Sequence, residues 1–215
     1  LWMNNKPEWL FLMYAVAKVG GVLVPLNTRY RREDIHYVVT QSNTGTIISD
    51  DQSGPVSYLD MLKEVLPDTA TGDPRAQRLE GFPDLRRIVF AGEDKLPGTF
   101  TWDEALAKAS SVTDETLRAR AAAVDPDGLA LIGYTSGTTG NPKGVMHSHI
   151  NIRNAMERGA ILGISFTDTE INYLPMFHLY ALGEVALICI VSGAKQILMD
   201  AFDAREALRL IESEN

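Results

Sequence analysis

Residues 134–144 read Tyr-Thr-Ser-Gly-Thr-Thr-Gly-Asn-Pro-Lys-Gly and follow directly on the apolar stretch 129–134. The glycines allow successive backbone N–H groups to turn inward and to approach a ligand without a Cβ clash, and a concavity of this kind binds anions. The four Ser and Thr hydroxyls add neutral donors that can also face a magnesium shell. Lys143 adds a mobile point charge suited to a phosphate. The stretch therefore predicts a cradle for a polyphosphate at the end of a buried strand.

Two other nucleotide-binding loops do not fit this spacing. A Walker A loop needs Gly directly before its Lys and Ser or Thr directly after it, whereas Pro142 and Gly144 flank Lys143. The segment 137–140 also lacks the glycine spacing of a Rossmann dinucleotide turn. A P-loop kinase or GTPase is therefore disfavoured. A plain solvated turn is disfavoured too, because the hydroxyls, the lysine and the preceding apolar strand occur together.

Short apolar stretches alternate with helical patterns along the chain. The patterns predict strands at 22–26, 46–49, 86–90, 129–134, 171–174 and 195–199, and helices at 7–19, 33–41, 58–66, 102–109, 115–123, 151–162 and 203–211. The apolar run 182–191 has the length of a helix, whereas 50–57 and 67–83 look like a loop and an exposed connection. Strand, helix and strand with short joins is typical of a parallel sheet with helices on its faces. The predicted fold class is therefore α/β.

Composition and charge limit the classes of function. The chain has 215 residues, of which 45% are hydrophobic and 22% charged, as in ordinary globular proteins. The net charge of -8 and the lack of a long basic stripe argue against a nucleic-acid partner. A local anion site is still compatible with this charge, because such sites use backbone N–H groups and one or two cations. The single cysteine, Cys189, excludes an internal disulfide and a cysteine-built metal site.

The sequence contains no recognisable membrane or export signal. No uninterrupted apolar run approaches the roughly 18 residues that a transmembrane helix needs. Residues 1–12 carry charges and Pro7, so they do not read as a signal peptide. A cytoplasmic location is the resulting expectation. The chain begins at Leu1 rather than Met and stops inside a helical pattern, so we expect it to be part of a longer protein.

Residues 134–144 resemble the signature loop of the adenylate-forming (AMP-binding) superfamily. This superfamily includes acyl-CoA synthetases, firefly-luciferase-like proteins and the adenylation domains of peptide synthetases. Residues 5–9 through 25–27 resemble its early helix–strand unit, and residues 145–149 resemble the strand after the loop, with His149 at the usual histidine position. Residues 173–178, Tyr-Leu-Pro-Met-Phe-His, resemble the next motif at the expected distance. The resemblance covers essentially the whole chain and implies a layered α/β domain with mostly parallel sheets.

The resemblance implies a reaction and its cofactors. Family members join a carboxylate to AMP with release of pyrophosphate, and most then transfer the acyl group to coenzyme A, so ATP, Mg²⁺ and coenzyme A are expected here. A carboxylate with a pKa near ~4 is already ionised at neutral pH, so the first step needs position and charge stabilisation rather than a general base. The residues implied to hold the phosphates are Thr135, Ser136, Gly137, Thr138, Thr139, Gly140 and Lys143. Thr135 is also expected in the magnesium shell.

His178 is the second candidate. The resemblance places it where the acyl substrate meets ATP, and we expect it to orient the carboxylate or to line the pocket; a core histidine is the alternative. The residues implied to line the acyl pocket are Phe177, Leu179, Tyr180, Leu182 and Gly183. An ordinary buried helix would show the same apolar pattern. His147 and His149 lack an evident third metal ligand, so no zinc site is predicted.

The family's remaining motifs have no counterpart in these 215 residues. Missing are the aromatic-Gly-x-Thr-Glu motif, the ribose-binding Asp, the small C-terminal domain with its catalytic lysine, and the upstream start of the fold. We therefore expect a fragment, inactive alone, of the large N-terminal domain of a carboxylic acid–CoA ligase. An amino-acid adenylation domain and a non-catalytic nucleotide-binding protein are the alternatives. Apolar residues around 180–190 favour a fatty or aromatic acid, and a homodimer is one expectation for the assembly.

Overall fold

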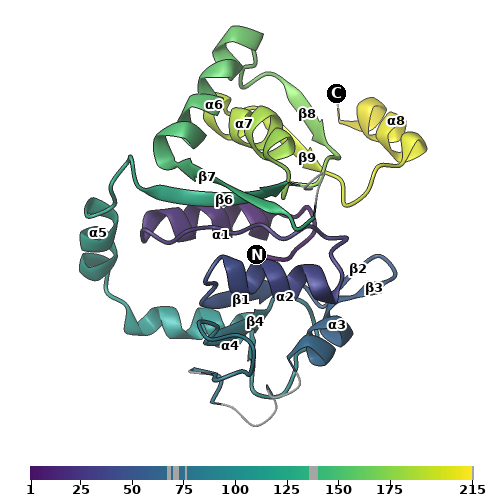
Figure 1. The fold of residues 1–215 in the computed structure, drawn as a ribbon. Helices are drawn as coiled ribbons and strands as arrows, with labels where there is room; N and C mark the ends of the chain where they lie inside the picture. Colours follow the sequence, from purple (N-terminus) through teal and green to yellow (C-terminus); the bar gives the residue numbers. More distant parts are fainter. Residues whose placement is uncertain (67–68, 70–72, 76, 136–139, 215) are drawn as a thin grey trace.

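The computed structural model describes residues 1–66, 69, 73–75, 77–135 and 140–214. Figure 1 shows two lobes, with the first helix between them. The helices are α1 (Pro7–Lys18), α2 (Arg32–Gln41), α3 (Tyr58–Val65), α4 (Trp102–Ala107), α5 (Asp114–Ala122), α6 (His149–Leu162), α7 (Leu187–Ser192) and α8 (Ala204–Ser213). The 3₁₀-helix η2 (Lys108–Ser111) follows α4, and the π-helix η3 (Ala181–Ala186) leads into α7.

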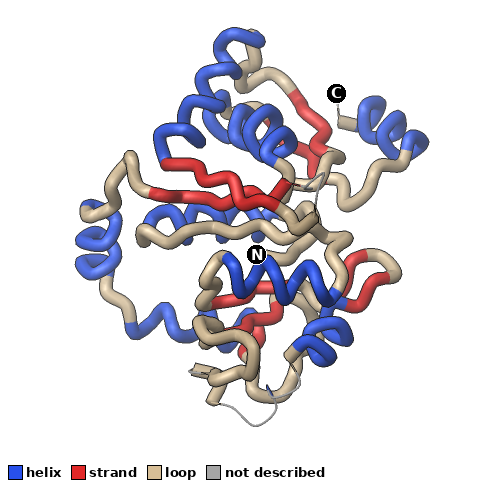
Figure 2. Tube along the Cα trace, in the orientation of Figure 1, coloured by secondary structure: helices blue, strands red, loops and turns tan. Residues whose placement is uncertain are grey.

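The strands are short and mostly parallel, and Figure 2 shows helices and long loops around them. They are β1 (Thr46–Ser49), β2 (Gln52–Ser53), β3 (Val56–Ser57), β4 (Arg87–Phe90), β5 (Phe100–Thr101), β6 (Leu129–Thr135), β7 (Lys143–Ser148), β8 (Thr169–Asn172) and β9 (Lys195–Leu198). One sheet has the order β1-β4-β5 with parallel pairing, and β8 pairs with β9 in parallel. The pairs β2–β3 and β6–β7 are antiparallel. The predicted α/β class is confirmed.

A first hydrophobic core lies in the lobe that contains β1 and β4. Ile47 and Ile88 from these strands are buried against Ile35 of α2 and Leu62 of α3. Trp2 stacks on Tyr58 with ring centroids 3.8 Å apart, and both rings are fully buried. Each such side chain contributes about 1.5–3 kcal/mol on leaving water. We call this cluster the first core.

A second core lies between α1 and the other lobe. Met13 of α1 packs in one cluster with Leu131 of β6, Met176 and Leu187. The segment between α1 and α2 also contacts β6, because the Leu23 N–H donates to the Ala130 carbonyl at 2.9 Å. Helix α1 is thus held against the β6–β7 pair, as Figure 1 shows. We call this cluster the second core.

Four predicted segments differ from the structure. The strand expected at 22–26 is a single bridge at Leu23, since Pro25 lacks the N–H that a longer ladder would need. The expected loop 50–57 contains the β2–β3 hairpin, whose turn includes Gly54 with φ +53°. The connection at 67–83 buries Leu79 and Phe82 in the first core rather than exposing them. The apolar run 182–191, predicted as one helix, begins in the π-helix η3 and continues in α7.

Most other predicted elements agree within two residues, including the helix at 7–19 and the strand at 46–49. The strand expected at 171–174 forms at Thr169–Asn172, and the helix at 102–109 divides into α4 and η2. Asp203 caps α8, with its carboxylate accepting the Glu206 N–H at 2.8 Å. Within the described part of the chain, no helix is both long enough and apolar enough to cross a bilayer.

Candidate functional site

The β6–β7 pair brings both ends of the predicted phosphate loop together. Thr135 is the last residue of β6 and lies opposite Lys143, the first residue of β7. The Thr135 hydroxyl and the Lys143 side chain are exposed at this edge, where the hydroxyl lies 3.5 Å from the Lys143 carbonyl oxygen. A neutral hydrogen-bond donor and a cation thus lie together at the end of the hairpin, and both kinds of group bind phosphates. Residues Ser136, Gly137, Thr138 and Thr139 lie outside the described residues, so their predicted role is not tested.

Two glycines shape this hairpin for different reasons. A Cβ at Gly144 would lie 2.9 Å from Ile132 Cγ2 and 3.2 Å from Tyr134 Cζ, so a side chain there would force these neighbours or the strand to shift. Gly140 has φ +143°, and a Cβ there would meet nothing within 4 Å. Its backbone conformation, rather than lack of space, therefore favours glycine. The open space beside Gly140 fits the prediction that a ligand approaches the backbone here.

Tyr134 connects the hairpin to the first core. Its ring packs against that core, and its hydroxyl donates to the side-chain oxygen of Gln41 at the end of α2. Burial raises the pKa of the Tyr134 phenol, so the group stays protonated and able to donate at neutral pH. Strand β6 is thus anchored at Tyr134, one residue before Thr135.

The predicted histidine lies in a turn between β8 and η3. The His178 N–H donates to the Pro175 carbonyl at 3.0 Å, and the His178 carbonyl accepts the Leu182 N–H at 3.1 Å. The rings of Phe177 and His178 are tilted, with centroids 4.4 Å apart. Desolvation lowers the pKa of His178 from 6.5, so its ring is neutral at pH 7. A neutral ring can hydrogen-bond to a carboxylate without forming an ion pair.

Leu179 brings this turn to the hairpin. A Cβ at Gly133 would lie 3.5 Å from Leu179 Cδ1, which places Leu179 against β6 two residues before Thr135. The structure therefore brings the two motifs that the sequence singled out to the same strand. Tyr180, 65% exposed, lies at the surface beside them.

The expected pocket residues divide into two groups. Phe177 is half-buried, while Leu179 and Tyr180 are exposed. Leu182 and Gly183 are buried, and Leu182 packs in the second core. A role in the acyl pocket stays a prediction for all five.

A cavity of about 510 Å³ opens beside this turn. It lies at the carboxyl ends of β8 and β9, where parallel sheets most often bind ligands. Tyr173 and Phe202 form part of its wall with ring centroids 5.0 Å apart, and Arg29 and Asp200 supply charges. The cavity thus combines apolar walls with a few polar groups, as small-molecule sites do.

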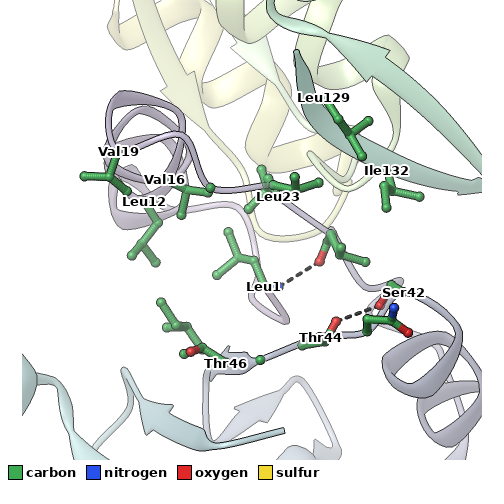
Figure 3. A pocket seen from close by; sticks show the side chains of 16 residues that line it. Leu1, Leu12, Val16, Val19, Leu23, Ser42, Thr44, Thr46, Leu129 and Ile132 are labelled. Atoms are coloured by element: carbon green, nitrogen blue, oxygen red, sulfur yellow. Dashed lines mark hydrogen bonds between the residues drawn. The ribbon is translucent and has the colours of Figure 1, made fainter. Parts of the chain in front are cut away.

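A larger cavity, of about 580 Å³, lies on the other side of α1 (Figure 3). Leu12, Val16, Leu23 and Ile132 line it, and none of its lining side chains titrates. Its polar side chains are the uncharged ones of Ser42, Asn43, Thr44 and Thr46, and no side chain of its lining carries a positive charge that could neutralise a phosphate. We therefore place the candidate site at the hairpin and the His178 turn.

The candidate metal ligand named from the sequence is Thr135. In the part of the chain that the structure describes, no three His, Cys, Asp or Glu side chains gather into a group that could hold a metal. Thr135 would supply one neutral oxygen, which suits Mg²⁺ that takes its remaining ligands from phosphates and water. The exposed hydroxyl fits that role, and the role stays a prediction.

Asn5 is a residue that sequence reasoning missed. Its side chain is buried and hydrogen-bonds to backbone groups of Leu174, Met176 and Met199, all next to the candidate site. Nothing in the local sequence separates Asn5 from an ordinary residue before a helix. The partners lie far along the chain, so the contact becomes visible only in the fold.

The fold and the site define an α/β protein with a candidate anion-binding hairpin beside a histidine turn. The family model described as "AMP-binding enzyme" matches residues 1–215. YngI of Bacillus subtilis (strain 168) is 34% identical over 215 residues, covering 100% of this chain and 39% of that protein. The mitochondrial medium-chain acyl-CoA ligase ACSF2 of Mus musculus is 31% identical over 226 residues, covering 100% of this chain and 36% of that protein. The inhibitor-bound N-terminal domain of FACL13 from Mycobacterium tuberculosis is similar with a TM-score of 0.69 and 26% identity, over 99% of this chain and 46% of that chain.

The chain belongs to the AMP-binding enzyme family. This confirms the resemblance drawn from residues 134–144, and the match to an N-terminal domain agrees with the predicted fold. The chain spans less than half the length of these relatives. The activity, substrates and partners of the whole protein are therefore matters for proposal.

Proposed function

We propose that the full-length protein is an AMP-forming acyl-CoA synthetase. It would activate a carboxylic acid with ATP, release pyrophosphate and transfer the acyl group to coenzyme A. One observation carries the proposal: the β6–β7 pair sets Thr135 opposite Lys143, and Leu179 packs the His178 turn onto the same strand. The candidate phosphate-binding groups at the end of the β6–β7 pair and the candidate carboxylate-orienting turn thus both lie against β6.

The residues of this chain would act by position and charge. Lys143 would neutralise the departing phosphates, and the hydroxyl of Thr135 would either donate a hydrogen bond to them or supply its oxygen to the magnesium shell. Bound Mg²⁺ would supply further neutralisation of phosphate charge. His178, neutral at pH 7, would hold the substrate carboxylate by a hydrogen bond and leave its charge available for attack. No general base is needed, since the acid is already ionised.

The proposed substrate is a fatty or aromatic acid. The accessible side chains beside His178 are apolar or aromatic, namely Phe177, Leu179 and Tyr180. Tyr173, five residues before the histidine, lines the cavity at the carboxyl ends of β8 and β9. We place the acid, or the acceptor thiol on its way to the acyl group, in this cavity.

We further propose that the 215 residues are a fragment of the large N-terminal domain and do not turn over alone. The share of its relatives that the chain covers supports this proposal. A thioester-forming assay on the 215-residue chain tests it, and normal turnover would contradict it. A cytoplasmic location stays part of the proposal; the mitochondrial relative makes that organelle the second candidate.

Acid-dependent exchange of pyrophosphate into ATP tests the proposed function. The full-length enzyme is assayed with a panel of fatty, aromatic and amino acids. We expect exchange that requires a fatty or aromatic acid and is abolished or strongly reduced by Lys143→Ala. Lys63→Ala is the matched control, because Lys63 is an exposed lysine on α3 in the other lobe. Exchange with no acid, or equal rates for both variants, would refute the proposal.

A further inference from the structure

Asn5 links segments that lie far apart along the chain. Its Nδ2 donates to the Leu174 carbonyl at 2.8 Å and to the Met199 carbonyl at 3.1 Å. Its Oδ1 accepts the Met176 N–H at 2.9 Å. The partners are separated from Asn5 by 169 to 194 residues. One buried carboxamide therefore fixes the chain after β8 to the chain after β9.

These backbone groups need a partner because the β8–β9 ladder has ended. The last register pair is Asn172 with Leu198, followed by one further bond from the Met199 N–H to the Asn172 carbonyl at 3.0 Å. Pro175 has no N–H to offer, so the turn cannot complete its own hydrogen bonds. A buried backbone group left without a partner costs about 1–3 kcal/mol. Only an amide side chain of this length supplies two donors and one acceptor together.

The position of His178 depends on this segment. Met176 is 1% exposed and anchored in the second core, and the His178 N–H donates to the Pro175 carbonyl at 3.0 Å. Asn5 thus fixes the turn on both sides of Pro175, at Leu174 and at Met176, and Met176 lies two residues before the histidine. Lys143 and Thr135 have no contact with Asn5 among the described hydrogen bonds and ion pairs. A change at Asn5 should move the histidine and leave the phosphate end in place.

We propose that Asn5 is a positioning residue for the acyl substrate, which it serves by holding the backbone at Leu174 and Met176 so that His178 meets the carboxylate. The inference rests on the proposed function, because it assigns His178 to the acid. The inference goes beyond the proposed function because it separates the residues that determine acid binding from those that determine ATP binding. A merely structural role would predict equal losses for both substrates.

The test measures KM for the acid and KM for ATP in the exchange reaction of the full-length enzyme. We expect Asn5→Ala to raise KM for the acid by about tenfold while KM for ATP changes less than about twofold. Gln77→Ala is the matched control, because Gln77 is also fully buried and its amide donates to the Thr69 carbonyl at 3.2 Å in the other lobe. The control should lower the melting temperature and leave both KM values unchanged.

A double-mutant cycle with His178→Ala shows whether Asn5 acts through the histidine. We expect the roughly tenfold loss in kcat/KM for the acid to shrink below about twofold when His178→Ala is already present. Additive losses, or an unchanged KM for the acid in Asn5→Ala, would overturn the inference. If Asn5→Ala does not fold, Asn5→Ser, which leaves room for a bridging water, is judged by the same criteria. Absence of exchange in the wild type would instead refute the proposed function.

Discussion

The two cores of this molecule differ in what they leave at the surface. The first core encloses β1 and β4, and the large side chains at its centre, such as Trp2, Tyr58 and Phe90, are fully buried. The second core is covered by the segments that carry the candidate chemistry, and His178, Leu179 and Tyr180 stay exposed above it. Both lobes thus have a buried core, but the candidate reacting groups lie on the surface of the second one.

The buried polar groups show the same division. In the first lobe, Gln77 and Thr99 bond to backbone carbonyls of their own lobe and hold its loops together. In the second, Asn5 binds the backbone beside the site from a distant part of the chain. Tyr134 joins the lobes by donating to Gln41. The site is thus positioned by a few long-range polar contacts in addition to the packing of Met176 and Leu182 in the second core.

The largest effect is expected in the first core. Ile88 is 0% exposed, and Ile88→Ala should lower the free energy of unfolding by about 3–4 kcal/mol through lost burial and a residual cavity. Because Ile88 is remote from the hairpin, KM for ATP should not change. Calorimetry and the exchange assay measure the two quantities. Leu106→Ala is the control, since Leu106 is 52% exposed; equal destabilisation by both variants would contradict the assignment of the core.

The next largest effect is expected at the exposed cation. Lys143→Ala should lower kcat/KM for ATP by about 100-fold, because the phosphates lose a charge partner in the transition state. The melting temperature should stay constant, since Lys143 is exposed and makes no ion pair among the described residues. Lys143→Arg should recover part of the loss. If Lys143→Ala instead lowered the melting temperature and left kcat/KM for ATP unchanged, Lys143 would be a structural residue and not a phosphate-binding one.

The sequence predicts the parts of this molecule that depend on local pattern. The apolar run at 46–49 is such a local feature, and β1 appears where it is expected. Residues 134–144 were sufficient for the family, because hydroxyl, glycine and lysine spacing expresses the chemistry directly. Of the seven residues predicted to hold the phosphates, the three that are described, Thr135, Gly140 and Lys143, are exposed.

What the sequence could not predict depends on contacts between distant segments. Leu79 and Phe82 sit among prolines and charges, and only the fold shows that the first core receives them. Glu184 interrupts an apolar run, yet it forms an ion pair with Arg158 of α6. The π-helix at η3 has no pattern of its own in the sequence. Asn5 is the clearest case, since its three partners are identified only when β8 and β9 are in place.

A smaller effect is expected from the glycines of the hairpin. Gly144→Ala should lower kcat/KM for ATP by about tenfold, because the new Cβ displaces the strand that carries Lys143. The clash partner is Ile132 Cγ2 at 2.9 Å. Gly133→Ala is the matched control on β6, where the nearest atom, Leu179 Cδ1, is at an ordinary 3.5 Å. Equal kinetics for the two variants would show that the hairpin base does not position the lysine.

The smallest effect is the pH dependence of acid activation. Desolvation lowers the pKa of His178 from 6.5, so the neutral ring persists at a lower pH than in an ordinary histidine. Protonation would pair the ring with the substrate carboxylate and weaken it as a nucleophile. The kcat/KM for the acid should therefore fall on acidification with a midpoint below 6.5. In His178→Asn, whose side chain still donates a hydrogen bond, this limb should be absent.

The same shift gives a signed prediction for stability. In the unfolded chain the ring takes up its proton near 6.5, before the folded ring does. The unfolded state then binds more protons, so wild-type stability falls as the pH drops through this value. The melting temperature of His178→Asn should decline less than that of the wild type over this range. A midpoint at or above 6.5 in the kinetic profile, with equal pH dependence of both melting temperatures, would show that the ring is not desolvated in the folded protein.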